Sequence, residues 1–190
     1  MKKAIVTSRT LTNRWGEDFA SVSQSLIQYL NWVGYSSISL SKHSTDDLHK
    51  FIGSFQPDLI VLSGGESIGE DLVRDSFEYN LLNVSQATGT PTLGVCRGMQ
   101  IIGSFLGQAP TPLMNHAGTR HLVSGMLSAE VNSFHNYGFE RVVMPLVPLI
   151  KAHDGTIEAF KHNNLPWLGV MWHPERDAPE NWHNVLRLIL

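Results

Sequence analysis

Cysteine and charged residues are scarce in this chain. Cys96 is the only cysteine among 190 residues, so an internal disulfide is excluded, and a free thiol is typical of a cytoplasmic protein. Charged residues make up only 16% and the net charge is −3, without any run of Lys and Arg that could neutralise phosphates. No segment approaches the roughly 18 apolar residues of a membrane span, and the first residues lack the apolar core of a signal peptide. We therefore expect a soluble protein whose partners include neither nucleic acid nor membrane.

The first hundred residues alternate short apolar runs with amphipathic stretches. Hydrophobic residues make up 42% of the chain, which is enough for the core of one globular domain over residues 1–190. The helix predicted over residues 44–55 has Ser44 or Thr45 as its cap. Strands that alternate with helices imply right-handed crossovers and a parallel sheet. The pattern predicts strands at 3–8, 36–40, 57–65 and 90–96, and helices at 17–34, 44–55, 75–89 and 97–107.

The second half has a different pattern. Residues 108–125 show no clear periodicity and are predicted to form a loop, and several short apolar segments follow, typical of a small, partly antiparallel extension. Residues 178–190 are predicted to form a terminal helix. The apolar face of that helix would consist of Trp182, Val185, Leu186 and Ile189. The chain is thus predicted to be an α/β protein with a mostly parallel central sheet flanked by helices, a three-layer arrangement of the flavodoxin type.

The single cysteine lies in "TLGVCRGMQIIGSF", residues 92–105, between a predicted strand and a predicted helix. A thiol in such a tight turn projects at the carboxyl end of the strand, as in a nucleophile elbow. The amino terminus of the helix lowers a thiol pKa, and the amide of Arg97 would face an oxyanion formed on an attacked acyl group. Gly94 and Gly98 would relieve crowding there. The alternative is that Cys96 is a small residue of the core.

A second candidate segment is "LGVMWHPER", residues 168–176, where an apolar strand ends at His173. Histidine is the usual base for a thiol nucleophile, and Glu175 could hold the imidazole through its other nitrogen. The alternative is a polar strand end that Pro174 terminates.

A third segment, "LIVLSGGESIGED" (59–71), runs from a strand into two glycines. In a parallel sheet this loop would lie beside the Cys96 turn, where open α/β sheets bind ligands. An amide of Gly64 or Gly65 could then complete an oxyanion hole, although an ordinary turn would show the same two glycines.

Together, "GVCRGMQ", "SGGESIG" and "WHPER" resemble the class I glutamine amidotransferase superfamily, and in particular its gamma-glutamyl hydrolase branch. Two further stretches, "VNSFHNYGF" (131–139) and "AHDGTIEAF" (152–160), are similar to segments of that branch. The resemblance implies that Cys96 is the nucleophile, His173 the general base and then acid, and Glu175 the group that orients the imidazole. It also implies that Gly65 and Arg97 donate the amides of the oxyanion hole.

The same resemblance implies a binding site for the glutamyl group. Gln100 and the backbone around Ser133, Phe134 and His135 match positions that hold its amino and carboxylate groups. The sequence departs from the branch at residues 135–137 and in the glycine loop, which leaves the identity of the leaving amine open.

The predicted activity is hydrolysis of a gamma-glutamyl amide through a thioester, with no cofactor. One alternative is a glutaminase subunit that supplies ammonia to a separate synthetase; a synthetase partner and a homo-oligomer both remain open. Another is a hydrolase that removes glutamate from a nucleotide-linked or phosphoramidate-linked intermediate, and a third is a non-catalytic binding module. Basic residues available for phosphate are Arg9, Arg14, Arg97, Arg120 and Arg176.

The nine histidines do not form a metal-binding motif in the sequence. No His-x-x-x-His pair occurs and no second cysteine accompanies them, so no metal site is expected. His116 and His121 fall in the predicted loop, and we expect one of them to line the mouth of the substrate site.

Overall fold

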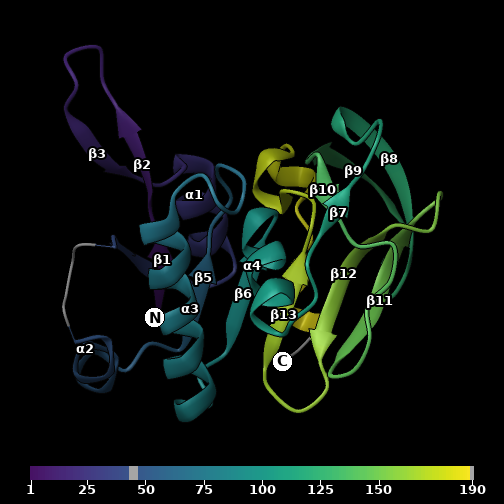
Figure 1. Cartoon of the computed structure of the whole chain (residues 1–190). Helices are drawn as coiled ribbons and strands as arrows, with labels where there is room; N and C mark the ends of the chain where they lie inside the picture. The colour runs from purple at the N-terminus through teal and green to yellow at the C-terminus, as the bar shows by residue number, and fades with distance from the viewer. Residues whose placement is uncertain (43–46, 189–190) are drawn as a thin grey trace.

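The computed structural model describes residues 1–42 and 47–188, and a nine-stranded sheet forms its centre (Figure 1). Five strands pair in parallel: β4 (Tyr35–Leu40), β1 (Lys2–Thr7), β5 (Leu59–Leu62), β6 (Thr92–Val95) and β13 (Trp167–Val170). Antiparallel strands continue the sheet from β13: β12 (Ile157–His162), β11 (Leu146–Ala152), β8 (Ala117–Gly125) and β9 (Ala129–Phe134). The predicted α/β class is confirmed, and the extension is a continuation of the same sheet.

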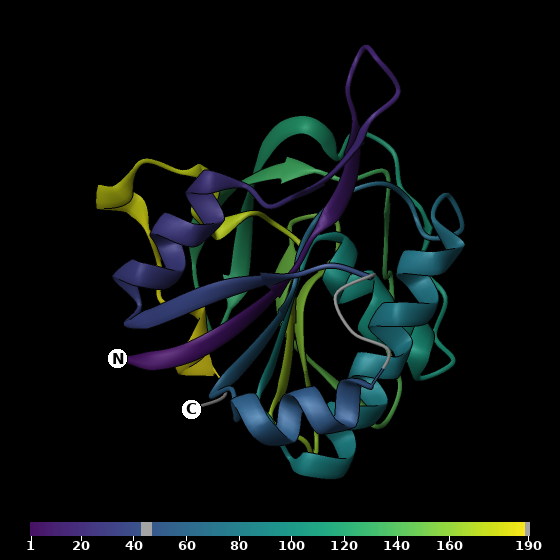
Figure 2. The ribbon, with the colours of Figure 1, turned by 90° about the vertical axis from the view of Figure 1, so that its left-hand side faces the viewer.

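Helices cover both faces of the parallel strands (Figure 2). One face packs against α1 (Gln24–Trp32) and the carboxyl-terminal residues Val185 and Leu186. The opposite face packs against α2 (Leu48–Phe55), α3 (Leu72–Thr88) and α4 (Arg97–Phe105). Both faces of β1 are therefore buried, as is usual for a parallel strand between two helical layers.

Local hydrogen bonds define where the helices start. Asp71 caps α3 by accepting from the amide of Arg74, and Asp47 caps α2 by accepting from the amide of Lys50. The caps predicted for α2, Ser44 and Thr45, lie outside the described residues. None of the described helices is long and apolar enough to cross a membrane.

The helix predicted over 17–34 is wrong in its first part. Residues Asp18–Ser21 form β3, which pairs with β2 (Arg9–Thr12) in a hairpin that projects from the body of the molecule (Figure 1). The Asn13 side chain accepts hydrogen bonds from the amides of Trp15 and Glu17 and so closes the turn. This turn chemistry and the strand pairing outweigh the helical spacing of apolar residues.

The loop predicted over 108–125 is also wrong. Residues Ala117–Gly125 form β8, which pairs with β9 on one side and β11 on the other. Two further residues, Thr111–Pro112, form β7 against β10 (Tyr137–Gly138). The glycines and polar residues of β8 obscured its alternation, in which the side chains of His121 and Val123 point inward and are buried.

The predicted terminal helix is replaced by two short 3-10 turns, Pro179–Asn181 and Val185–Leu188. The hydroxyl of Tyr29 on α1 donates to the carbonyl of His183 and accepts from the amide of Val185. Trp182 packs edge-on against Tyr29, with ring centroids 5.6 Å apart. Contacts with α1 therefore hold this segment in an irregular conformation, while Ile189 lies outside the described residues.

Candidate active site

Cys96 lies between β6 and α4 in a backbone conformation that few non-glycine residues adopt. Its φ is 53° and its ψ is −106°, outside the allowed regions for an L-residue. Such strain is characteristic of a nucleophile elbow and persists only where the surroundings enforce it. Here the amide of Cys96 donates to the carbonyl of Val170 on β13 at 2.8 Å. A side chain at Gly98 would overlap the carbonyl of Leu62, so a glycine permits this close packing of α4 on β5.

His173 follows β13 at the same edge of the sheet and is paired with Glu175. The imidazole Nδ1 lies 2.7 Å from Glu175 Oε1, and both side chains are buried. Pro174 opens a 3-10 turn, Pro174–Arg176, which places the carboxylate two residues on beside the ring. Burial alone would lower the pKa of His173, but its contacts with Cys96 and Glu175 raise the pKa to about 9.

Gly64 packs directly against the imidazole of His173, where a side chain would not fit. A Cβ atom at Gly64 would lie 2.8 Å from His173 Cε1 and 3.8 Å from Cys96 Cβ. The glycine loop after β5 therefore contacts both the thiol-bearing residue and the histidine. The structure brings together the three residues that the sequence selected for covalent catalysis, Cys96, His173 and Glu175.

The backbone of His173 is held by Asn132, which the sequence analysis did not select. The amide of His173 donates to Asn132 Oδ1 at 3.1 Å, and Asn132 Nδ2 donates to the His173 carbonyl at 2.8 Å. Asn132 is buried on β9, so it ties the antiparallel end of the sheet to the candidate base. The asparagine is present in the quoted stretch "VNSFHNYGF", but its burial on β9 is visible only in the structure.

The two amides predicted to form the oxyanion hole lie on adjacent elements. Gly65 follows β5 and Arg97 is the first residue of α4, and β5 and β6 are neighbours in the sheet. The first amides of a helix have no acceptor within the helix, so the N–H of Arg97 is free of the α4 ladder. Their role in binding an oxyanion stays a prediction.

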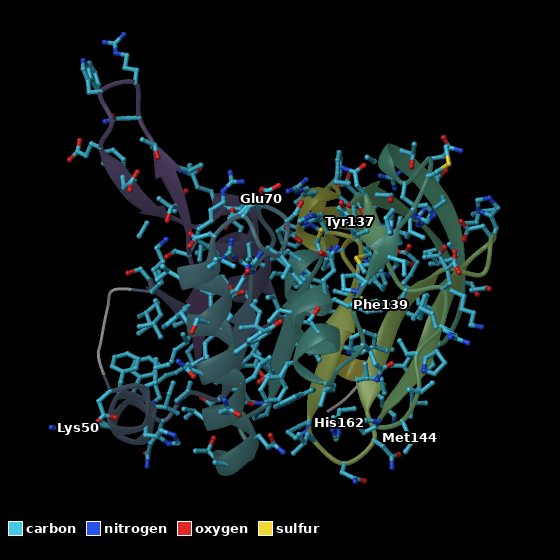
Figure 3. All side chains as sticks on the ribbon, in the orientation of Figure 1. Lys50, Glu70, Tyr137, Phe139, Met144 and His162 are labelled. Atoms are coloured by element: carbon cyan, nitrogen blue, oxygen red, sulfur yellow. The ribbon has the colours of Figure 1, made fainter. Side chains whose placement is uncertain are left out.

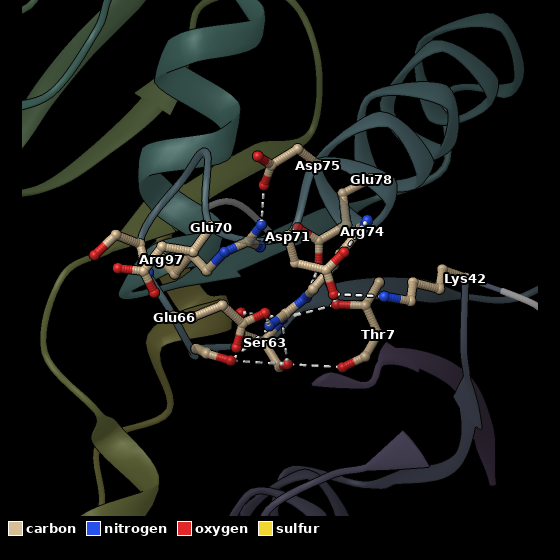
Figure 4. Close-up of polar contacts among 12 residues, drawn as sticks. Thr7, Lys42, Ser63, Glu66, Glu70, Asp71, Arg74, Asp75, Glu78 and Arg97 are labelled. Atoms are coloured by element: carbon tan, nitrogen blue, oxygen red, sulfur yellow. Dashed lines mark hydrogen bonds and ion pairs between the residues drawn. The ribbon is translucent and has the colours of Figure 1, made fainter. Parts of the chain in front are cut away.

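A cluster of five charged residues lies beside the glycine loop, the segment that follows β5 (Figure 4). We call it the arginine cluster: Arg74, Arg97, Glu66, Asp75 and Glu78. Arg74 pairs with Glu78 at 3.1 Å and with Glu66 at 2.8 Å, and Arg97 pairs with both Asp75 and Glu78. Burial alone would lower the pKa of Arg97, but Glu78 and Asp75 raise it. The side chain of Arg97 therefore pairs with carboxylates of α3 and is not available to a substrate phosphate.

The arginine cluster also holds the glycine loop in place. Arg74 Nη2 donates to the carbonyls of Ser63 and Gly64, at 3.1 and 3.2 Å. Thr7 on β1 donates to Glu78 at 2.7 Å and accepts from the amide of Ser63. Because Arg97 and the loop share these partners, α3 fixes the position of α4 relative to the loop. Arg74 and Glu78 were not selected from the sequence, because their i,i+4 spacing on α3 does not show that they reach Arg97 and the glycine loop.

The residues predicted to bind the glutamyl group have defined partners within the protein. Gln100 lies one turn beyond Cys96 on α4 and donates to the carbonyl of Tyr137 at 2.9 Å. Ser133 donates to the carbonyl of His116. Phe134 is half exposed, and its ring centroid lies 6.2 Å from that of His173. Tyr137, labelled in Figure 3, lies on the short strand β10 beside β7. Contact of these residues with a substrate stays a prediction.

A cavity of about 210 Å³ opens beside the histidine. Gly64, Gly65 and His173 line one part of it, and Arg9 and Arg176 line another. Arg176 also lies over the Phe134 ring, with its guanidinium carbon 4.8 Å from the ring centroid. Arg9 begins β2, so the projecting hairpin borders this cavity.

The expectation that His116 or His121 lines the mouth of the substrate site is wrong. Both side chains are buried, and neither lines the cavity beside His173. They face Glu158 on β12 instead, together with His135. For His121 the mistaken loop over 108–125 caused this error, because its side chain points inward from β8, whereas His116 directly precedes β8 and is buried against Asp154 and Glu158.

The chain matches known proteins in sequence and in fold. The family model of glutamine amidotransferase class-I matches residues 17–190. A gamma-glutamyl-CDP-amidate hydrolase of Campylobacter jejuni is 34% identical over 134 residues, which cover 67% of each chain. Component 2 of anthranilate synthase from Azospirillum brasilense is 26% identical over 186 residues, 92% of each chain.

Among solved structures, a glutamine amidotransferase of Thermotoga maritima has the same fold. It superimposes with a TM-score of 0.70 at 16% sequence identity and covers 100% of this chain and 88% of its own. A cysteine at a strained strand-to-helix turn, with a paired histidine and glutamate beside it, is the arrangement of an α/β enzyme with a thiol nucleophile. The chain belongs to the glutamine amidotransferase class-I family.

Proposed function

We propose that this protein is a cysteine hydrolase that cleaves a gamma-glutamyl amide through a gamma-glutamyl thioester. The observation that carries the proposal is the placement of Cys96 at a strained elbow beside an imidazole that Glu175 holds at 2.7 Å. Glu175 accepts from Nδ1, so Nε2 is left for the thiol and the leaving group. Contacts with Cys96 and Glu175 raise the pKa of His173 to about 9, which supports its role as the group that takes the proton of the thiol.

In the first half of the reaction, Cys96 Sγ attacks the gamma-carbonyl and His173 carries the proton of the thiol. The amides of Gly65 and Arg97 stabilise the oxyanion of the tetrahedral intermediate. When the C–N bond breaks, His173 gives its proton to the departing nitrogen and the thioester remains on Cys96. In the second half, His173 removes a proton from water, the hydroxide attacks the thioester, and glutamate leaves as the thiol is restored.

The leaving group is proposed to carry phosphate, as in a nucleotide-linked or phosphoramidate-linked substrate. Two arginines, Arg9 and Arg176, line the same cavity as His173. Guanidinium groups suit phosphate because they offer planar, paired donors. The name of the Campylobacter relative describes such a substrate for that protein, which supports the same chemical class here.

Supply of ammonia to a synthetase is the competing function. The match to component 2 of anthranilate synthase supports it, because that relative is one component of a synthase. A glutaminase subunit depends on its partner for full activity, whereas a hydrolase acts unaided. Whether the chain works alone or with a synthetase is therefore a measurable property of the isolated chain.

The test is glutamate release by the isolated chain from glutamine, gamma-glutamyl alkylamines and gamma-glutamyl amidates of nucleoside diphosphates. We expect turnover of the amidates without a partner, and loss of turnover in Cys96→Ala with the fold retained by circular dichroism. Arg176→Ala should raise KM for the phosphate-bearing substrates while the kcat for an alkylamine substrate stays unchanged. Arg120→Ala is the control, since Arg120 is exposed and lies outside this cavity.

Two outcomes would contradict the proposal. Turnover by Cys96→Ala would exclude the thioester. Activity on glutamine alone, rising only when a synthetase is added, would favour the ammonia-supplying function.

A further inference from the structure

Three histidines surround one buried carboxylate at the antiparallel end of the sheet. We call this group the histidine cluster: His116, which directly precedes β8, His121 on β8, His135, which directly follows β9, and Glu158 on β12. The Glu158 side chain is fully buried, with His121 Nε2, His135 Nε2 and His116 Nδ1 at 3.3, 3.4 and 3.7 Å from its Oε1. None of these four atoms, nor Glu158 Oε2, makes a hydrogen bond to any residue that the structure describes.

In His135 and His116, one ring nitrogen faces Glu158 and the other makes a hydrogen bond elsewhere. That second hydrogen bond determines whether the nitrogen facing Glu158 carries a proton or a lone pair. His135 Nδ1 lies 3.1 Å from the Tyr137 carbonyl, which can only accept, so Nδ1 carries the proton. His116 Nε2 lies 2.8 Å from a carboxylate oxygen of Asp154, so Nε2 carries the proton there. In the neutral rings, His135 Nε2 and His116 Nδ1 are then acceptors that face a third acceptor. A cation between them would satisfy all three groups.

We propose that the histidine cluster binds a divalent transition-metal ion, with Zn²⁺ as the preferred ion. His116 Nδ1, His135 Nε2 and Glu158 are the core ligands, and these atoms lie within 4.8 Å of one another. His121 Nε2 lies near the same carboxylate oxygen but outside this group of three, so a water molecule would fill the fourth position. Imidazole and carboxylate ligands in this number suit Zn²⁺.

The distances from Glu158 Oε1 to the ring nitrogens are close to those between ligand atoms of a zinc site. Bonds of about 2.0–2.1 Å in a tetrahedral zinc site place the ligand atoms about 3.3–3.5 Å apart. The separations of 3.3 and 3.4 Å from Glu158 Oε1 to His121 and His135 match this spacing, and that of 3.7 Å to His116 is a few tenths of an ångström longer. A Zn²⁺ ion would also balance the charges of Glu158 and Asp154 with all three rings neutral.

The surroundings have the outer shell that metal-binding histidines usually show. Such a ligand donates its other ring N–H to a carboxylate or a backbone carbonyl, which fixes its tautomer. Asp154 serves His116 in this way and the Tyr137 carbonyl serves His135. His116 and Asp154 also line a cavity of about 520 Å³, which gives an ion a route to the cluster from the surface.

None of the residues of the histidine cluster lines the cavity beside His173, so the ion does not take part in the chemistry at Cys96. It would instead hold the segment that follows β9. His135 belongs to that segment, Ser133 donates to the carbonyl of His116, and the Tyr137 carbonyl accepts from both His135 and Gln100. The metal site is thus connected to the region predicted to bind the glutamyl group, but its existence does not depend on that function.

The experiment measures metal binding directly in a Cys96→Ser chain, in which the thiol cannot bind an ion. After treatment with a chelator, the protein is titrated with Co²⁺ and then with Zn²⁺, and the metal retained after desalting is quantified by mass spectrometry. We expect one ion per chain and the intense visible absorption of four-coordinate Co²⁺, which Zn²⁺ abolishes. Because no turnover is measured, the result is independent of whether the proposed hydrolase activity is found.

The variants locate the ion. Glu158→Gln should retain no metal, and Asp154→Asn should weaken binding by about 10- to 100-fold, the effect usual for loss of an outer-shell carboxylate. His49→Asn is the matched control, because His49 is an exposed histidine on α2 and should leave binding unchanged. If Glu158→Gln does not fold, Asp154→Asn decides, since the Asp154 side chain is 40% exposed.

Three results would overturn the proposal. The first is a Cys96→Ser chain that retains no stoichiometric metal. The second is binding that Asp154→Asn and Glu158→Gln leave unchanged, and the third is binding that His49→Asn removes.

Discussion

The arginine cluster and the histidine cluster are both buried groups of titratable residues, but their charged groups are paired in different ways. In the arginine cluster, two guanidinium groups donate to three carboxylates, and Glu78 is paired with both arginines. In the histidine cluster, one carboxylate faces three ring nitrogens. Neither these nitrogens nor the carboxylate oxygens make a hydrogen bond to a described residue. A buried charge is tolerated when it is paired and hydrogen-bonded. In the first cluster each carboxylate is therefore paired with an arginine, although Arg97 Nε makes no hydrogen bond to a described residue, whereas the second cluster needs a proton or a metal ion.

The positions of the two clusters explain this difference. The arginine cluster joins α3 to α4 and the glycine loop, where a fixed geometry of the elbow is required (Figure 4). Arginine cannot lose its proton, so this support persists over a wide pH range. The histidine cluster joins β8, β9 and β12, and its charge depends on pH or on bound metal.

Removing one partner from the arginine cluster should have the largest effect on stability. Glu78→Gln leaves both Arg74 and Arg97 short of a buried counter-ion, and breaking such a pair costs about 3–5 kcal/mol in the free energy of unfolding. Urea denaturation measures this loss. The control is Glu130→Gln, which removes the exposed partner of Arg120 and should change stability by no more than about 1 kcal/mol. Equal effects of the two variants would show that the arginine cluster does not support the fold.

Metal should stabilise the protein through the histidine cluster alone. Zn²⁺ at a free concentration 100 times its Kd should raise the free energy of unfolding by about 2.7 kcal/mol if the unfolded chain does not bind it. The same addition to Glu158→Gln should leave stability unchanged, whereas Glu78→Gln, if it folds, should retain the increase. Denaturation with and without Zn²⁺ provides the comparison. An increase in Glu158→Gln as large as in the parent would place the stabilising ion elsewhere.

His173 offers a third comparison, because its imidazole has a dedicated carboxylate partner. Its pKa is raised from 6.5 to about 9 in the folded protein, so the native state binds the proton more tightly than the unfolded state. This contribution is fully present below pH 6.5 and is lost as the pH rises through 9. It amounts to about 3 kcal/mol at most.

The measurement is the free energy of unfolding across that pH range. Glu175→Gln should flatten its fall between pH 6.5 and 9, since it removes one of the two groups that raise the pKa of His173. Glu130→Gln, in the exposed pair, should leave the slope as it is. A slope that Glu175→Gln does not change would assign the titration to another group.

The sequence predicted the local elements well wherever tertiary contacts did not oppose them. The apolar runs of β1, β5 and β6 and the spacing of α3 and α4 are visible in the chain, because buried strands and packed helices require those patterns. The predictions failed at β3, at β8 and at the carboxyl-terminal segment. In these places a hairpin turn, a strand with glycines and polar residues, and contacts with Tyr29 decided the conformation.

The same division applies to the candidate site. Residue types and strand ends in the sequence were sufficient to select Cys96, His173 and Glu175, because each follows a buried strand or its turn. The sequence could not show that Asn132 holds the backbone of His173, since 41 residues separate them. Nor could it show that the Arg97 side chain turns into α3, because that depends on how α3 packs against α4.

By itself, the sequence determined the alternation of strands and helices, the elbow around Cys96 and the residue types at the ends of the strands. These features follow from local backbone preferences and from the periodicity of apolar residues, and both can be read from the order of residues in the chain. Only the tertiary structure decided which distant charges meet: two arginines with three carboxylates, and three histidines with Glu158. Electrostatic pairing acts through space, so it is set by strand order and register.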